Sequence, residues 1–196
     1  MEIQKKGNEI IIRKKLTSKE TYKISKSKKR ETISFYKKPS KIKGMASSTE
    51  DGKDVLFIDY DNTDKKVVLN DYKLLQGLFR LPQGYLFESS ENSYHVVCLR
   101  KFKPSEIYHI LSFTHTDSAY MSMPLRNLYK NWVLRIGTKK SKGRPKTRGI
   151  IGKPQNVGTL SKAHYDFLNK IFPNLENPKY NQFDKLKKIC LQEYES

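Results

Sequence analysis

The chain has 196 residues, of which 36% are hydrophobic and 11% aromatic, so it can form a folded core and is not disordered as a whole. Its 39 Lys and Arg against 20 Asp and Glu leave a net charge of +19, which favours a polyanionic partner, above all nucleic acid. The two widely spaced cysteines argue against a cysteine zinc module or a disulfide framework, and no long apolar run is present, so we expect a soluble, intracellular, cytoplasmic protein with no membrane partner.

The N-terminal part of the chain is the most basic. Residues 1–44 hold 15 Lys or Arg against four Glu. Within them, three short runs rich in β-branched and aromatic residues are bounded by Lys or Ser clusters: 9–13, 21–24 and 32–36. These runs are either strands of a basic sheet or arms that order only on a ligand. We therefore predict a basic N-terminal extension over 1–50, partly β or flexible, and a catalytic domain over 51–196.

The predicted domain begins after a linker at residues 44–53. The apolar run 55–58, which ends in Asp59, is typical of a buried strand that delivers acidic side chains at its end. A helix is then predicted over 70–81, with Asn70 as its N-cap. Four apolar residues at helical spacing support it: Leu74, Leu75, Leu78 and Phe79.

A hairpin and a helix follow in the sequence. Residues 84–88 and 93–99 are predicted strands, and the polar residues 89–92 form the turn that joins them. Residues 104–113 are a predicted helix with Pro104 in its first turn, where a missing backbone N–H costs nothing.

The C-terminal third is predicted to contain one more strand, a loop and two helices. The strand covers 132–136, and residues 138–153 form a basic loop with seven Lys or Arg and no acid. Amphipathic helices are predicted over 161–172 and 181–194. This order of elements predicts an α+β fold with a mixed or antiparallel sheet flanked by helices.

The first chemical motif is the pair Asp59 and Asp61. Residues i and i+2 of a strand share a face, so both carboxylates would project together. Their repulsion is relieved by a divalent cation such as Mg²⁺ or Mn²⁺, which takes oxygen ligands and leaves positions for phosphate. The alternative is a solvated turn.

Other polar residues follow at intervals. Ser93 and His95 share a strand face and could bind a phosphate, although a half-buried, hydrogen-bonded histidine is the plainer interpretation. Asp117 could supply a third carboxylate or cap a turn. Arg135 lies between apolar strand residues and needs a partner, either a phosphate or a buried carboxylate.

The order and spacing of these residues resemble the catalytic core of the archaeo-eukaryotic primase superfamily, particularly its small plasmid and virus primase-polymerases. That family carries a D-x-D on a strand, an S-x-H, a third acid, and a basic segment reading roughly R-x-P-G-T-x-N-x-K. The counterparts here lie within residues 55–140, and Ile136 departs from the family pattern. They are Asp59 and Asp61, Ser93 and His95, Asp117, and then Arg135, Gly137, Thr138 and Lys139.

The resemblance implies a primase-type core with an RNA-recognition-like sheet. It implies that Asp59, Asp61 and Asp117 are the catalytic acids that bind Mg²⁺ or Mn²⁺. It also implies a set of nucleotide-binding residues: Ser93, His95, Arg135 and Lys139. From the charge of the loop we expect five further residues to bind nucleic acid: Lys140, Lys142, Arg144, Lys146 and Arg148.

The function predicted is metal-dependent nucleotidyl transfer on a nucleic-acid template, as in a DNA primase or primase-polymerase. Its partners would be single-stranded or primed DNA and nucleoside triphosphates, with Tyr and Phe rings as stacking platforms for bases. No P-loop motif is present, so a helicase or another replication protein would be a separate chain. The alternatives are a non-catalytic replication accessory protein that binds nucleic acid and, less favoured, a metal-dependent nuclease.

Overall fold

The computed structural model describes these parts of the chain: 2–6, 9–13, 23–27, 30–34, 42–126, 131–138, 143–173, 175–179, 182–184 and 191–194. The chain divides into two compact units. The first is Met1–Lys41 with Glu195–Ser196, and the second is Ile42–Tyr194. Residues 42–50, predicted as the end of the N-terminal extension, therefore lie in the second unit.

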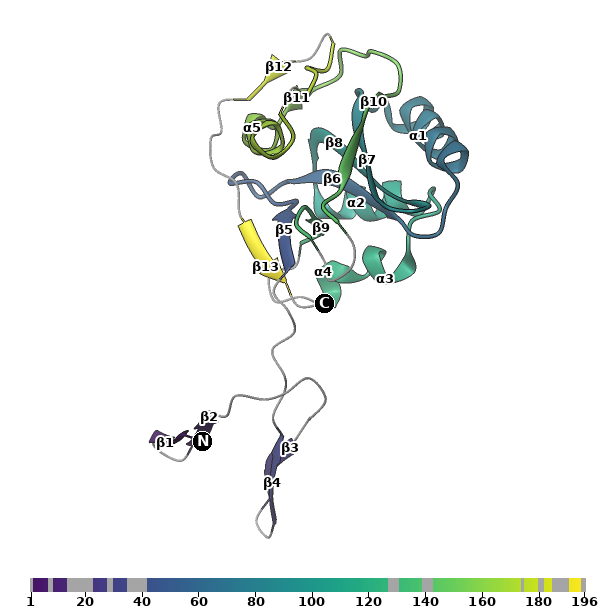
Figure 1. Ribbon diagram of the computed structural model, residues 1–196. Coiled ribbons are helices and arrows are strands. Elements are labelled where there is room, and N and C mark those ends of the chain that lie inside the picture. Colours follow the sequence, from purple (N-terminus) through teal and green to yellow (C-terminus); the bar gives the residue numbers. More distant parts are fainter. Residues whose placement is uncertain are drawn as a thin grey trace. The chain divides into compact units, whose positions relative to one another are not determined.

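The first unit contains two antiparallel hairpins (Figure 1). In one, β1 (Glu2–Lys6) pairs with β2 (Glu9–Arg13), and in the other β3 (Lys23–Ser27) pairs with β4 (Arg30–Ser34). Strand β2 coincides with the predicted run 9–13, and the other two runs overlap β3 and β4. Of the two alternatives that the sequence left open, the structure shows strands.

The larger sheet of the second unit is built around β8 (Ser93–Phe102). Strands β6 (Asp54–Tyr60) and β7 (Gly84–Ser90) pair antiparallel with its two edges, and β10 (Lys146–Ile151) pairs with β7. The short strand β11 (Thr159–Leu160) also pairs antiparallel with β8, and parallel with β12 (Gln182–Phe183). The second unit is thus α+β with a mixed sheet, as predicted.

A smaller antiparallel sheet has β5 (Ile42–Ala46) at its centre, between β13 (Leu191–Tyr194) and β9 (Val133–Arg135). The prediction of a linker at 44–53 was wrong at its start, because Met45 and Ala46 are fully buried core residues of β5. The helix predicted over 181–194 was also wrong, since β12 and β13 lie in that range. Strands β12 and β13 are stabilised by pairing with distant segments, and this pairing overrides the local helical spacing of apolar residues.

The described chain contains five helices: α1 (Lys65–Phe79), α2 (Pro104–Leu111), α3 (Ser118–Met121), α4 (Met123–Arg126) and α5 (Lys162–Ile171). Helix α2 confirms the prediction at 104–113, and α5, capped by Ser161, confirms the one at 161–172. Helix α1 begins earlier than predicted, because the Asp64 side chain caps it by accepting from the Lys66 amide at 2.6 Å. Within the described ranges, every helix is too short or too polar to cross a bilayer.

Helices α1 and α5 lie on either side of strands β7, β8 and β10 (Figure 1). On the α5 side, the ring of Phe87 packs on that of Phe172 with centroids 4.7 Å apart. On the α1 side, the hydroxyl of Tyr72 donates to the carbonyl of Pro82 at 2.8 Å. Tyr85 and Phe87 are only 1% and 3% exposed, so these two rings belong to the core and are not available to stack on bases.

Candidate active site

The centre of the candidate site is Asp59, near the end of β6. The antiparallel register places Asp59 opposite His95 of β8, with Nε2 of His95 3.2 Å from Oδ1 of Asp59. The two side chains are 21% and 7% exposed, respectively. The contact lacks hydrogen-bond geometry, and no described residue donates a hydrogen bond to this buried oxygen. A buried carboxylate oxygen without a donor has lone pairs available for a cation.

A segment distant in the sequence closes the outer edge of β6 at this residue. The Thr116 hydroxyl donates to the carbonyl of Asp59 at 2.7 Å, and the Asp117 amide donates to the same carbonyl at 3.1 Å. These bonds fix the main chain of Asp117 beside that of Asp59. The structure therefore brings together three of the predicted site residues: Asp59, His95 and Asp117.

The carboxylate of Asp117 also has a local structural role. It is the N-cap of α3 and accepts from the amides of Ala119 and Tyr120, at 3.2 and 3.0 Å. Each oxygen receives one of these bonds, so each keeps lone-pair capacity for a further donor or a metal ion. The capping bonds hold the carboxylate in one orientation next to the end of β6.

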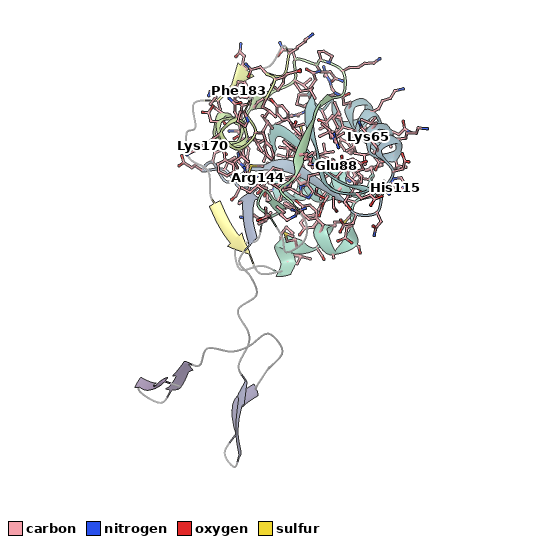
Figure 2. The ribbon with its side chains drawn as sticks, in the orientation of Figure 1. Lys65, Glu88, His115, Arg144, Lys170 and Phe183 are labelled. Carbon is pink, nitrogen blue, oxygen red and sulfur yellow. The ribbon has the colours of Figure 1, made fainter. Side chains whose placement is uncertain are left out.

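Asp71 of α1 supports the same segment and was not identified from the sequence. Its carboxylate, 7% exposed, accepts from the His115 amide at 2.8 Å and lies 3.0 Å from Nδ1 of the same residue. The His115 ring is 70% exposed at the periphery of the second unit (Figure 2). Burial, together with the Asp71 carboxylate, raises the pKa of Tyr60 on the adjacent strand. A signal was present in the sequence, because Asp71 lies between Val68 and Leu75 on the apolar face of the helix, where a carboxylate needs a partner.

Asp61 lies outside the strand that was expected to hold it. Strand β6 ends at Tyr60, Asp61 is exposed, and Asn62 has a left-handed φ of 50°. The alternation of a strand therefore does not set the direction of Asp61, and the predicted shared face with Asp59 was wrong. Across the part of the chain that the structure describes, no three His, Cys, Asp or Glu side chains form a metal-binding cluster.

Ser93 is the first residue of β8, directly after the turn at 91–92. The residue is 3% exposed, and its hydroxyl donates to the carbonyl of Glu91 at 3.4 Å. Ser93 and His95 lie two residues apart on this strand, so they share a face as predicted. The binding of a phosphate by the two side chains stays a prediction.

Among the described residues, no acid forms an ion pair with Arg135, and its guanidinium is bonded to the main chain instead. Its guanidinium donates to three backbone carbonyls: Ser89 at 2.5 Å, Gly137 at 3.0 Å and Gly143 at 2.8 Å. It thereby ties β9 to the end of β7 and to the two flanks of the segment 137–143. A small cavity of about 10 Å³, enough for one water, is lined by Arg135 and His95 among other residues.

The basic segment after β9 is only partly a loop. Strand β10 occupies 146–151, so the prediction of a loop across 138–153 was wrong in its second half. Arg144 and Lys146 are exposed, whereas the guanidinium of Arg148 binds Glu88, with Nε 2.6 Å from Oε2. Figure 2 labels Arg144 and Glu88. Three predicted contacts, Lys139, Lys140 and Lys142, lie outside the described residues.

Comparison of the chain with protein-family models, with curated proteins and with solved structures finds no match.

Proposed function

We propose that this protein is a metal-dependent nucleotidyltransferase that acts on a nucleic-acid template, as a DNA primase or primase-polymerase. The observation that carries the proposal is the hydrogen bond from the Asp117 amide to the Asp59 carbonyl, beside the contact of Asp59 with His95. Three segments far apart in the sequence thus meet at Asp59, in the order of the primase motifs: His95 at its carboxylate and Asp117 at its main-chain carbonyl.

The donor set suits Mg²⁺ or Mn²⁺. Magnesium sites in polymerases use one or two carboxylates, and substrate phosphates and water complete the octahedron. Oδ1 of Asp59 lacks a hydrogen-bond donor among the described residues, and both oxygens of Asp117 keep free lone pairs. The exposed Asp61 follows directly after the strand, and its carboxylate could add a further oxygen ligand to a bound metal. When bound, the metal lowers the pKa of the attacking 3′-hydroxyl and neutralises charge on the phosphates.

The protein residues around the metal ligands act mainly by positioning. His95, 5% exposed, contacts the side chain of Asp59 from the neighbouring strand and would hold it in place. Thr116 and the buried Asp71 hold the segment that carries Asp117. Arg135 serves the fold, because its bonds to Gly137 and Gly143 attach both flanks of the basic segment to β9.

The net charge of +19 provides the attraction for the template strand. Lys predominates over Arg in residues 1–44, and a lysine ammonium neutralises phosphate without reading bases. The described part of the basic segment adds Arg144 and Lys146, which are exposed and form no ion pair with a described acid. The template would therefore be gripped through its backbone, without sequence preference.

A second candidate is a non-catalytic replication accessory protein that binds nucleic acid. It is favoured by the structural bonds of two predicted site residues: Asp117 caps α3, and Arg135 donates to three backbone carbonyls. In this alternative the acids serve only the fold, and the basic residues bind DNA in the same way.

The test is an assay of strand synthesis. The full chain is incubated with a single-stranded template, labelled nucleotides and Mg²⁺ or Mn²⁺, and products are separated on denaturing gels. A nucleotidyltransferase gives new strands only when triphosphates and metal are both present. Shortening of the template without triphosphates would identify a nuclease instead, and DNA binding without either product would leave the accessory protein.

A further inference from the structure

Helix α1 has an outward face that is apolar and that no described residue covers. The sequence predicted a core face of four residues for this helix: Leu74, Leu75, Leu78 and Phe79. In the structure only Leu75 of this set is fully buried. Leu74 and Leu78 are 50% and 52% exposed, and they lie one turn apart on the same side. Figure 1 shows α1 at the periphery of the second unit. Two neighbouring exposed leucines on one helix face form a patch of the kind found at binding surfaces.

The patch contains a shallow, wide-open groove of about 380 Å³. It is lined by residues of this one helix: Asn70, Lys73, Leu74, Gly77 and Leu78. Gly77 lies in the middle of this set, and a Cβ atom added there would meet nothing within 4 Å. Packing within the described chain therefore does not require glycine at this position, although glycine is among the poorest residues for a helix interior. A glycine here leaves room for the close approach of another chain.

The exposed charged residues of the helix and its C-cap are all basic: Lys65, Lys66, Lys73 and Arg80. The only acid within the helix, Asp71, is buried, and the exposed Asp64 at the N-cap accepts from the Lys66 amide. A second copy of this face would bring lysines against lysines, and the N-terminal segment of this chain is itself strongly basic. Nucleic acid would pair with the lysines but would gain nothing from the leucines and the glycine. Charge complementarity selects an acidic partner with an apolar stripe.

We propose that the outward face of α1 is a docking site for an acidic amphipathic helix of a partner protein. Apolar side chains of that helix would pack against Leu74 and Leu78 and pass over Gly77, in the helix-in-groove manner. Its Asp and Glu side chains would face Lys66, Lys73 and Arg80. The inference is independent of the proposed function, because it uses no residue of the candidate active site.

The test is a selection from a displayed library of helical peptides, with the full chain as bait. The matched control bait carries Leu74→Lys and Leu78→Lys. It is more basic than the wild type, so peptides held by charge alone bind it at least as well. The proposal predicts enriched peptides with apolar residues three or four positions apart and acidic flanks. Their affinity should fall by about tenfold or more for the control bait.

Gly77 gives a second, independent readout. Gly77→Ala should raise the Tm of the free protein by a few degrees, about 2–4 °C, because it improves helix propensity without a clash. Gly77→Leu should weaken the selected peptides by about tenfold, because it fills the groove. A Tm that Gly77→Ala lowers would show that the chain itself occupies the groove, and would contradict the proposal.

Other outcomes identify other occupants and overturn the inference. Peptides that bind both baits equally, the absence of any enrichment, or enrichment of basic peptides would exclude an acidic helix. Self-association in sedimentation that the double Lys variant abolishes would assign the face to a second copy. Binding to phosphatidylserine vesicles that the same variant abolishes would assign it to a lipid surface.

Discussion

The amide of Asp117 donates a hydrogen bond to the carbonyl oxygen of Asp59 at 3.1 Å, so the main chains of two acidic residues from distant segments lie side by side. It is a main-chain bond of the kind that pairs strands. Thr116 and Asp71 both hold the segment that carries Asp117 in place, so the closeness of Asp59 and Asp117 depends on these contacts.

Asp117 can be tested with variants that separate its two roles. Asp117→Ser keeps a side-chain oxygen at the N-cap of α3 but removes the carboxylate, so we expect unfolding free energy close to wild type and loss of nucleotide incorporation. Asp117→Ala removes the capping oxygen as well as the carboxylate, so it should also lower the free energy of unfolding by about 1 kcal/mol. Denaturant unfolding and the incorporation assay measure the two effects. Full incorporation by the Ser variant would restrict Asp117 to capping.

Arg135 is expected to affect stability more than nucleotide affinity. Arg135→Met leaves three carbonyl groups without their donor, and we expect a loss of about 2–4 kcal/mol in the free energy of unfolding. Triphosphate affinity per folded molecule should stay close to wild type at low temperature, as titrated with a fluorescent nucleotide. A Kd that rises tenfold or more, by about 1.4 kcal/mol, in a fully folded variant would show instead that Arg135 contacts the nucleotide.

His164 predicts how stability depends on pH. Its Nε2 lies 2.9 Å from the carbonyl of Ala46, which can only accept, so Nε2 carries the proton and Nδ1 accepts from the Ser161 hydroxyl at 2.7 Å. Burial lowers the pKa of His164 from 6.5 to about 4. Between these two pH values the imidazole is protonated in the unfolded chain but neutral in the folded chain. The free energy of unfolding therefore falls as pH drops from 6.5 towards 4, by about 3 kcal/mol in total.

The measurement is the free energy of unfolding between pH 7 and pH 5. His164→Gln should be less stable at pH 7 and should lose much of the pH dependence in this window. The matched control is His109→Gln, because His109 is exposed on α2 and should leave the slope unchanged. An equal slope in the wild type and in His164→Gln would contradict a neutral, buried imidazole.

The exposed basic residues predict the salt dependence of DNA binding. Arg144→Gln and Lys146→Gln should each reduce the log–log slope of affinity against salt by about 0.7 on single strands, equally for unrelated sequences. Lys170→Gln, on the exposed face of α5 (Figure 2), is the control and should leave the slope unchanged. If the slopes of all three variants equalled the wild-type slope, the nucleic acid would bind elsewhere on the protein.

Sequence patterns predicted those elements that local chemistry determines. The apolar run at 55–58 forms the buried part of β6, Pro104 begins α2, and Ser161 caps α5. The start of α1 was predicted at Asn70 rather than Asp64 because both are good caps, and only the bond from the Lys66 amide distinguishes them. These errors are small and local.

Elements that depend on distant pairing could not be predicted in the same way. Strand β5 was expected to be a linker because its buried Met45 and Ala46 are specified by β9 and β13, which flank it from other parts of the chain. Of the candidate site, the motif residues Asp59, His95 and Asp117 were predicted and are brought together. The bonds of Arg135 to carbonyls and of Asp71 to His115 were not, because main-chain acceptors and donors leave no mark in the side-chain sequence.

The most direct test of the account is template-directed incorporation by Asp59→Asn compared with the wild type. The substitution keeps the size of the side chain and removes the charge that a metal requires, while Asp166→Asn alters an exposed acid on α5 and serves as the control. We predict metal-dependent strand synthesis by the wild type and by Asp166→Asn, and loss of about 100-fold or more in Asp59→Asn with unchanged DNA binding. Synthesis by Asp59→Asn at the wild-type rate would contradict the central claim, and so would its absence in the wild type under all metal conditions.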